Sequence, residues 1–426
     1  MEVWVLFGVF TLLLLIGTPV AFCLGIASTA TVLYMGLPPV VVFQQVNSGM
    51  NAFAMMAIPF FIYAGDLMMR GGIADRLIRL AAGFVGHLRG GLGQVNVVAS
   101  TLFGGISGSA IADASAIGGI MIPQMEKRGY AKDYSVNVTV NAAIIALLIP
   151  PSHNMIIYSI AAGGTISVAD LFTAGIVPGF LLAAALMITA YVVAVRRGYP
   201  ADPFPGFRLL GYFFVSAVPG ILLIFIIFGG VRSGVFTATE SSCIAVVYAV
   251  LVTLFVYREL DWQGFVEATL GAVRTTAMVL LVIGTASAFG WLMAFLQVPQ
   301  ATIALMKTVS DNPIVVLLLI NVILLVLGTF MDMAPMIIIC TPIFLPVIKA
   351  FGIDPVHFGV ILILNAGIGL NTPPVGSVLF VGCAVGKITI GEAMKTIWPF
   401  LGVSVLVLLL VTYIPGLSLW LPALFR

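Results

Sequence analysis

Charged residues are scarce in this chain. Only 8% of its 426 residues are Asp, Glu, Lys or Arg, whereas 61% are hydrophobic, and the mean hydropathy is +1.20. Soluble domains carry about 25% charged and about 45–50% apolar residues. A water-soluble fold of this length has no room inside for so much apolar surface. The sequence therefore predicts a membrane protein whose outer surface faces lipid.

Clusters of residues typical of enzymes and metal centres are also missing. The four cysteines stand far apart, and neither they nor the three histidines have metal-ligand spacing. There is no HExxH sequence and no Cys/His cluster. We therefore expect no enzyme activity. A net charge of +2 gives no argument for a nucleic-acid partner.

Two apolar stretches, near 91–125 and 313–348, do not have the form of simple spans. Each is longer than the roughly 20 residues that one span needs, and each contains a glycine- and acid-containing break. The first lies between Arg89 and Lys127, and basic flanks favour the cytoplasmic side at both ends. The second lies between Asp311 and Pro355, which we expect outside. Each stretch predicts a re-entrant hairpin, and the two hairpins start from opposite sides of the membrane.

An internal repeat supports this interpretation. At an offset of 223 residues, Gly105 falls on Gly328 and Pro150–Pro151 falls on Pro373–Pro374. Two successive prolines break a helix because they remove backbone donors. The sequence thus predicts an all-α polytopic membrane protein with inverted repeats, two re-entrant hairpins and two broken helices, a pattern that indicates a secondary transporter. The predicted parts are N-terminal scaffold helices with a cytoplasmic amphipathic arm (1–90), a first transport repeat (91–170), further scaffold helices with a second arm (171–311), a second transport repeat (312–395) and a C-terminal span (396–426).

The hairpin tips and the helix breaks supply oxygen atoms suited to Na⁺. Hydroxyls and freed carbonyls coordinate cations, and half-helix N-termini attract anions. We expect each repeat to supply one Na⁺ site and part of a carboxylate site, although such breaks also serve as kinks and packing points in membrane helices. His153 and Asn154, beside the first break, are candidates to face a substrate cavity.

Four acids lie at or near membrane depth, where charge is expensive. For Asp113 and Asp332, cation coordination, proton coupling and hairpin capping all remain open. Glu240 is expected to cap the N-terminus of the following span. Asp66 stands one turn from Arg70, which predicts a structural ion pair.

Four motifs resemble one known family. They are FGGISGSAIADASAIG (103–118), GVFTATESS (234–242), GTFMDMAPMIII (328–339) and LNTPPVG (370–376). Over essentially its whole length the chain resembles the large membrane subunit of tripartite ATP-independent periplasmic (TRAP) transporters. The resemblance implies a bacterial inner-membrane importer of organic acids, such as sialic acids or C4-dicarboxylates, driven by a Na⁺ gradient through an elevator motion. It also implies a small membrane subunit and a periplasmic substrate-binding protein as partners, besides the membrane lipid.

The resemblance also points to residues. Na⁺ is expected at Ser107, Gly108, Ser109, Ile149, Pro150 and Pro151 in the first repeat, and at Gly328, Thr329, Asp332, Asn371, Thr372 and Pro374 in the second. Substrate contacts are expected from Ser109, Asp113, Ser152, His153, Asn154, Gly376 and Ser377. An alternative function is a stand-alone Na⁺- or H⁺-coupled carboxylate transporter or antiporter that works without a binding protein.

Overall fold

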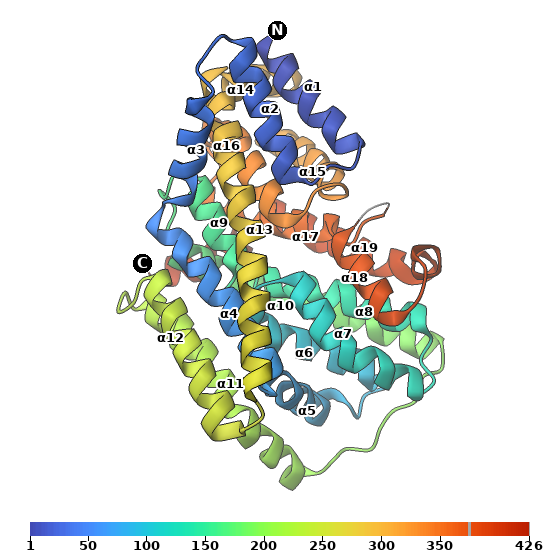
Figure 1. The fold of residues 1–426 in the computed structure, drawn as a ribbon. Helices are drawn as coiled ribbons and strands as arrows, with labels where there is room; N and C mark the ends of the chain where they lie inside the picture. Colours follow the sequence, from blue (N-terminus) through green and yellow to red (C-terminus); the bar gives the residue numbers. More distant parts are fainter. Residues whose placement is uncertain (374–375, 426) are drawn as a thin grey trace.

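The computed structural model describes residues 1–373 and 376–425, which form helices joined by short loops (Figure 1). The helices are α1 (Glu2–Leu15), α2 (Val20–Tyr34), α3 (Val40–Met50), η1 (Phe53–Met56), α4 (Ala57–Arg70), α5 (Ile73–Val85), α6 (Gly91–Ser107), α7 (Ala110–Lys127), α8 (Lys132–Ala143), η2 (Ile144–Leu147), α9 (His153–Ala161), α10 (Val168–Arg196), α11 (Phe207–Arg232), α12 (Ala238–Leu251), η3 (Val252–Tyr257), α13 (Trp262–Phe295), α14 (Val298–Val309), α15 (Pro313–Gly328), α16 (Met333–Ala350), α17 (Pro355–Gly369), α18 (Ser377–Gly386), α19 (Ile390–Tyr413) and α20 (Gly416–Leu424).

Seven helices of the described chain are long and apolar enough to cross a membrane. They are α4 with η1, α10, α11, α12 with η3, α13, α16 and α19. The longest is α13, with 34 residues, which runs beside α3 and α4 (Figure 1). The predicted all-α polytopic fold is confirmed.

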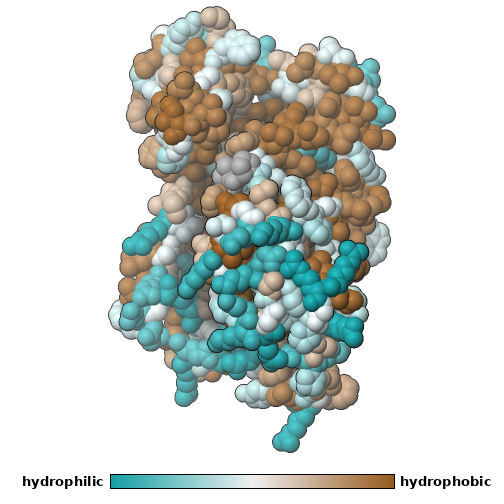
Figure 2. Space-filling view, turned by 90° about the vertical axis from the view of Figure 1, so that its right-hand side faces the viewer, coloured by the Kyte–Doolittle hydropathy of each residue, from teal (hydrophilic) through white to brown (hydrophobic). Residues whose placement is uncertain are grey.

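One end of the molecule carries most of the ion pairs. Arg70 at the end of α4 pairs with Glu267 in α13 (2.6 Å), and Arg197 after α10 pairs with Asp133 in α8 (2.9 Å). Figure 2 shows hydrophilic residues gathered over the lower half of the molecule and hydrophobic residues over the upper half. By the positive-inside rule, the basic end is the cytoplasmic face.

Both ends of the first hairpin, α6 and α7, lie at this face. Gly90, just before α6, donates its N–H to the Pro200 carbonyl (3.1 Å). Arg128, just after α7, forms an ion pair with Asp202 (2.6 Å). Because both ends contact the loop between α10 and α11, the hairpin returns to the side from which it started.

The second hairpin, α15 and α16, starts at the opposite face. Its position follows from α19, which begins at the cytoplasmic face, where Arg197 donates to the Thr396 hydroxyl (2.8 Å). At the other end of α19, the Tyr413 hydroxyl donates to the Ile314 carbonyl in α15 (3.4 Å). A helix of 24 residues spans roughly 36 Å. The two hairpins therefore have opposite orientations.

The internal repeat is visible in the helix bounds. α7 begins at Ala110 and α16 at Met333, while α8 begins at Lys132 and α17 at Pro355, each pair 223 residues apart. The same order of long helix, short arm, hairpin, broken helix and long helix runs from α4 to α10 and from α13 to α19. The arms are α5 and α14, as the amphipathic pattern predicts. The short helix α3, which packs on α13, was missed by the sequence analysis.

Candidate functional site

Each hairpin packs against its broken helix where only glycine fits. A Cβ on Gly104 would lie 2.6 Å from the Ala146 Cα, and a Cβ on Gly328 would lie 3.0 Å from the Gly369 Cα. Real Cβ atoms do not approach backbone so closely without a shift of the neighbour. These two contacts, one in each repeat, hold the hairpin tips against the helix breaks.

The tip of the first hairpin is a three-residue turn. Ser107 ends α6, Gly108 reverses the chain with φ +59°, and Ser109 caps α7 with its hydroxyl. A Cβ on Gly108 would lie 2.9 Å from the carbonyl oxygen of Pro151. Asn154 donates its side-chain amide to the Gly108 carbonyl (3.1 Å). The tip is therefore held directly on the first helix break.

The first break runs from η2 to the start of α9. It contains Ile149 and a cis Pro150–Pro151 peptide bond, and Ser152 is the N-cap residue of α9. The Pro150 carbonyl oxygen lies 3.2 Å from the Cβ position of Gly105. Ser152 Oγ and His153 Nδ1 are buried here without a hydrogen-bond partner. The break thus turns carbonyl oxygens, and an unpaired hydroxyl, towards the hairpin.

The second tip is closed by Asp332. Its carboxylate accepts hydrogen bonds from the Met333 N–H (2.9 Å) and from the Ser377 hydroxyl (3.3 Å). The Gly376 N–H, at the start of α18, donates to the Thr329 carbonyl (3.4 Å). Of the three roles left open for Asp332, the structure thus shows capping of α16.

Other predicted ligands of the second repeat point away from its tip. Asn371 is buried and donates its amide to the Val140 carbonyl of α8 (2.6 Å), while its Oδ1 has no partner. The Thr372 hydroxyl donates to the Ile368 carbonyl (2.8 Å). The predicted ligand Pro374 lies outside the described residues. In the described chain, no three His, Cys, Asp or Glu side chains come together in a group that could hold a metal ion.

A cavity of about 780 Å³ lies between the hairpin tips and the scaffold helices. Its hairpin side contains five of the predicted site residues: Ser107, Ser109, His153, Asn154 and Asp332. Its other wall comes from α2, α4 and α13, with Phe22, Ile62 and Met278 among the apolar residues. A cavity that both tips and the scaffold line is a place where a transported solute can be held between the two repeats.

Several predicted substrate residues do not line this cavity. Ser152, Gly376 and Ser377 lie behind the tips in the contacts described above. Asp113 is fully buried in α7, although Ile111, Ala112 and Ser115 of the same helix line the cavity. The side chain of Asp113 therefore faces the interior of the hairpin.

The sequence analysis missed the scaffold wall. Asp66 in α4 and Thr275 in α13 line the cavity, and the close ion pair of Arg70 is formed with Glu267 (2.6 Å) rather than with Asp66. The sequence contained a signal for this wall, because a carboxylate (Asp66) and a hydroxyl (Thr275) stand in otherwise apolar helices. The prediction for Glu240 is correct, since it forms a capping box with the N-cap residue of α12.

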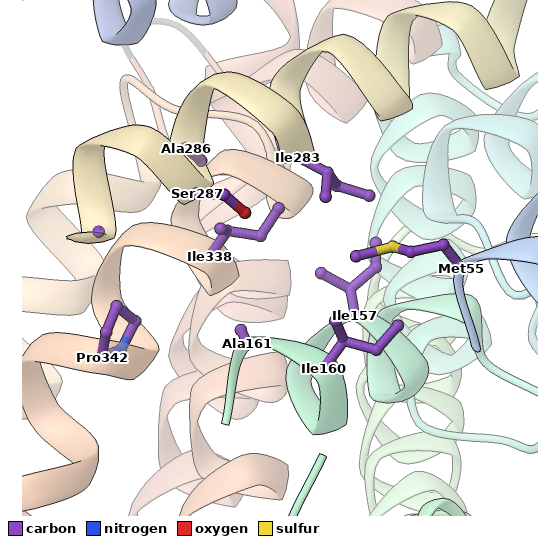
Figure 3. Close-up of a pocket in the computed structure, with 10 residues that line it drawn as sticks. Met55, Ile157, Ile160, Ala161, Ile283, Ala286, Ser287, Ile338 and Pro342 are labelled. Carbon is purple, nitrogen blue, oxygen red and sulfur yellow. The ribbon is translucent and has the colours of Figure 1, made fainter. Parts of the chain in front are cut away.

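A second cavity, of about 210 Å³, separates α13 from α9 and α16 (Figure 3). Ile283 and Ala286 approach it from α13, Ile157 from α9 and Ile338 from α16. The lining side chains are apolar except for the Ser287 hydroxyl. Helices α9 and α16 are therefore incompletely packed against α13 around this cavity.

The sequence matches a family of known transporters. The profile of the "Tripartite ATP-independent periplasmic transporter, DctM component" matches residues 7–417. This chain belongs to that family. It is a membrane-embedded permease subunit of a TRAP transporter, located in the bacterial inner membrane, and the predicted resemblance is confirmed.

Several relatives match over nearly the whole length of this TRAP permease. A protein of Salmonella typhimurium named "Uncharacterized protein YgiK" is 47% identical, over 99% of this chain and 97% of the relative. The sialic acid TRAP transporter large permease SiaM of Vibrio cholerae is 40% identical, over 97% and 96% of the two chains. The C4-dicarboxylate permease DctM of Rhodobacter capsulatus is 36% identical, over 99% of each.

The fold is also similar to that of a solved transporter. The YdaH transporter of Alcanivorax borkumensis superimposes with a TM-score of 0.61, covering 89% of this chain and 87% of that one, at 14% sequence identity. At this identity the likeness concerns the fold alone. It agrees with a transporter architecture built of helices.

Proposed function

We propose that this TRAP permease imports an organic acid anion together with Na⁺. A periplasmic binding protein delivers the anion, and a small membrane subunit works beside the permease. The observation that carries the proposal is the cavity that both hairpin tips share with the scaffold helices. A solute in this cavity touches both repeats at once, so its binding can be linked to ions bound behind the tips.

The Na⁺ ions are proposed to lie where each tip meets its helix break. In the first repeat, hard oxygen atoms are offered by Ser107, by the carbonyls of Pro150 and Pro151, and by the unpaired Ser152 hydroxyl. Gly328, Thr329 and Asp332 form the corresponding tip in the second repeat, with the Asn371 Oδ1 free to accept. Oxygen ligands of this kind suit a hard cation.

The charge of the cavity bears on the substrate class. Its described lining contains two carboxylates, Asp66 and Asp332, and neither Lys nor Arg. A substrate carboxylate is therefore proposed to bind at the N-termini of α7 and α9, near Ser109 and Asn154, where the helix dipoles favour an anion. A second carboxylate has no fixed positive charge to meet. This favours a singly charged acid with hydroxyl groups, such as a sialic acid, over a C4-dicarboxylate.

The mechanism is proposed to be an elevator. The helices of the two hairpins and two broken helices would move together against α4 and α13. The incompletely packed, aliphatic contact in Figure 3 supports this, because a smooth apolar surface with a gap resists sliding less than an interlocked polar one.

Uptake into proteoliposomes tests the proposal. The vesicles would hold this chain with its small subunit under an imposed Na⁺ gradient, with labelled sialic acid or succinate, and with or without the cognate binding protein. We expect sialic acid uptake that requires both the gradient and the binding protein. Gradient-driven uptake that ignores the binding protein would instead identify a stand-alone transporter.

A further inference from the structure

The scaffold wall of the large cavity carries a carboxylate that is open to a solute. Asp66 in α4 lines the cavity, and within the described chain its carboxylate makes neither a hydrogen bond nor a close ion pair. The other carboxylate of the lining, Asp332, already accepts hydrogen bonds from the Met333 N–H and the Ser377 hydroxyl. Asp66 is therefore the acid of this cavity that remains available to a bound molecule.

Asp66 lies beside the tip of the first hairpin. A Cβ on Gly65, the residue before Asp66, would lie 3.6 Å from the Ser107 Cα, so α4 touches the tip at this point. Ser109, two residues beyond Ser107, and Asn154 line the same cavity. These are the residues near which the substrate carboxylate is proposed to bind. The Asp66 carboxylate and the proposed anion site thus belong to the same part of the cavity.

Helix α13 leaves room for the Asp66 carboxylate. A Cβ on Gly271 would lie 3.1 Å from Asp66 Oδ2, which is tighter than nine in ten real Cβ contacts. Thr275, one turn further along the same face of α13, adds a hydroxyl to the cavity lining. A carboxylate and a hydroxyl both accept hydrogen bonds, whereas an ammonium group has three N–H donors and no acceptor. This wall therefore has the acceptors that an ammonium group needs.

The charges around this wall sum to a negative value. Arg70, one turn after Asp66, is the charged group that acts on it, but Arg70 forms its close ion pair with Glu267 (2.6 Å). Together these three side chains carry one net negative charge. The described lining of the cavity contains neither Lys nor Arg. A positive group on a solute is therefore attracted to this wall, and a second negative group is repelled.

We propose that the cavity accepts a second class of substrate, an acid that carries one carboxylate and one ammonium group. The carboxylate binds at the first tip, near Ser109 and Asn154, and the ammonium group donates hydrogen bonds to Asp66 and Thr275. The site prefers such an amino acid to the acid in which a hydroxyl replaces the ammonium group. This inference rests on the proposed function, because it takes the cavity as the substrate site.

Thermal stabilisation of the purified permease with its small subunit, in saturating Na⁺ and without the binding protein, tests this preference. The probes are 5-aminopentanoate and 5-hydroxypentanoate, which share the chain and the carboxylate and differ only in the ammonium group. We expect wild type to be half-saturated at an about fivefold lower concentration of the amino acid, because opposite charges attract. In Asp66→Asn the two concentrations should become equal. Glu126→Gln, which changes an exposed acid at the end of α7, should keep the preference.

Other outcomes would overturn the inference. Equal binding of the two acids by wild type, or a preference that survives in Asp66→Asn, would show that Asp66 does not bind the ammonium group. If Asp66→Asn raises the Na⁺ concentration needed for stabilisation by 5-hydroxypentanoate more than about threefold, Asp66 binds Na⁺ instead. Stabilisation by sialic acid but by neither probe would refute the second substrate class and leave the proposed function standing. No stabilisation by any of the three acids would count against both.

Discussion

The side-chain amide of Asn371 donates to the Val140 carbonyl at 2.6 Å, and this hydrogen bond joins the two broken helices. Val140 lies one turn before the end of α8, where the chain tightens from an α-helix into the 3₁₀ turn η2 and the Ile144 N–H bonds to Asn141 instead. The tightening releases the Val140 carbonyl within the buried part of α8, which runs from Tyr134 to Ala143. The break in one repeat is thus stabilised by a side chain from the break in the other.

Asn371→Ala should therefore destabilise the transporter. It leaves a buried carbonyl without a partner, which costs about 1–3 kcal/mol. We expect a lower unfolding temperature in detergent and reduced uptake. Asn51→Ala, at the exposed end of α3, is the control and should change neither. Equal unfolding temperatures for wild type and Asn371→Ala would mean that the bond contributes little.

Gly108→Ala tests whether the first tip must touch the helix break. Gly108 and Gly129 both have positive φ, 59° and 81°, but only at Gly108 would a Cβ meet an atom, the Pro151 carbonyl oxygen at 2.9 Å. Both substitutions carry the same conformational cost, of about 1 kcal/mol. We expect Gly108→Ala to raise the Na⁺ concentration for half-maximal uptake about tenfold and Gly129→Ala to leave it nearly unchanged. Similar values for the two variants would place the Na⁺ site elsewhere.

Much of this architecture was predictable because breaks in apolar sequence are local signals. The paired prolines, glycine-rich tips and basic flanks predicted both hairpins and their opposite orientations, since each depends on residues close together in the chain. Side-chain directions were not predictable in the same way. Asp113 and Ile111 are two residues apart in α7, yet one is buried in the hairpin and the other lines the cavity.

The wall of the cavity formed by the scaffold helices shows a second limit of prediction from sequence. Arg70 lies one turn from Asp66 in sequence but binds Glu267, which is 197 residues away. That choice is fixed by the packing of α4 on α13, and pairing across two helices leaves no local pattern. The sequence therefore predicted a structural role for Asp66 beside Arg70 and did not reveal that Asp66 lines the cavity.

Asp66→Asn should change substrate selection. The wild-type carboxylate repels a second substrate charge, and two like charges about 4 Å apart in water repel by about 1 kcal/mol. We expect the KM for succinate to fall about fivefold relative to that for sialic acid. Glu126→Gln, at the exposed end of α7, should leave this ratio unchanged. A constant ratio in Asp66→Asn would show that Asp66 does not select against a second charge.

Acid should weaken the cytoplasmic junction of α8, α10 and α19. Partial burial raises the pKa of Asp133, but hydrogen bonds from Arg197 and Thr396 outweigh it and hold this pKa below its ordinary value of 3.8. A carboxyl group whose pKa is lower in the folded state stabilises the fold above the unfolded pKa and loses that effect as the pH falls through the folded pKa. The gap in unfolding temperature between wild type and Asp133→Asn should be constant at neutral pH and shrink below about pH 4.

The control for this measurement is Asp202→Asn, which breaks an exposed ion pair with Arg128. Exposed pairs contribute about 0–1 kcal/mol, so its unfolding temperature should follow that of wild type at every pH. If the difference in unfolding temperature between wild type and Asp133→Asn stays constant down to pH 3, folding does not lower the pKa of Asp133.

The cavity beside α13 allows a test of whether α9 and α16 slide along α13, and the test leaves every proposed ion and substrate ligand in place. Ala286→Leu adds aliphatic atoms to the cavity of about 210 Å³ that separates α13 from α9 and α16. Filling a cavity commonly stabilises a protein by about 0.5–2 kcal/mol. We expect a higher unfolding temperature together with slower uptake, because the added side chain locks the hairpin-bearing helices against α13. Ala277→Leu, on an exposed position of the same helix, should affect neither quantity. Full uptake in a stabilised Ala286→Leu would mean that the two units do not slide along this surface.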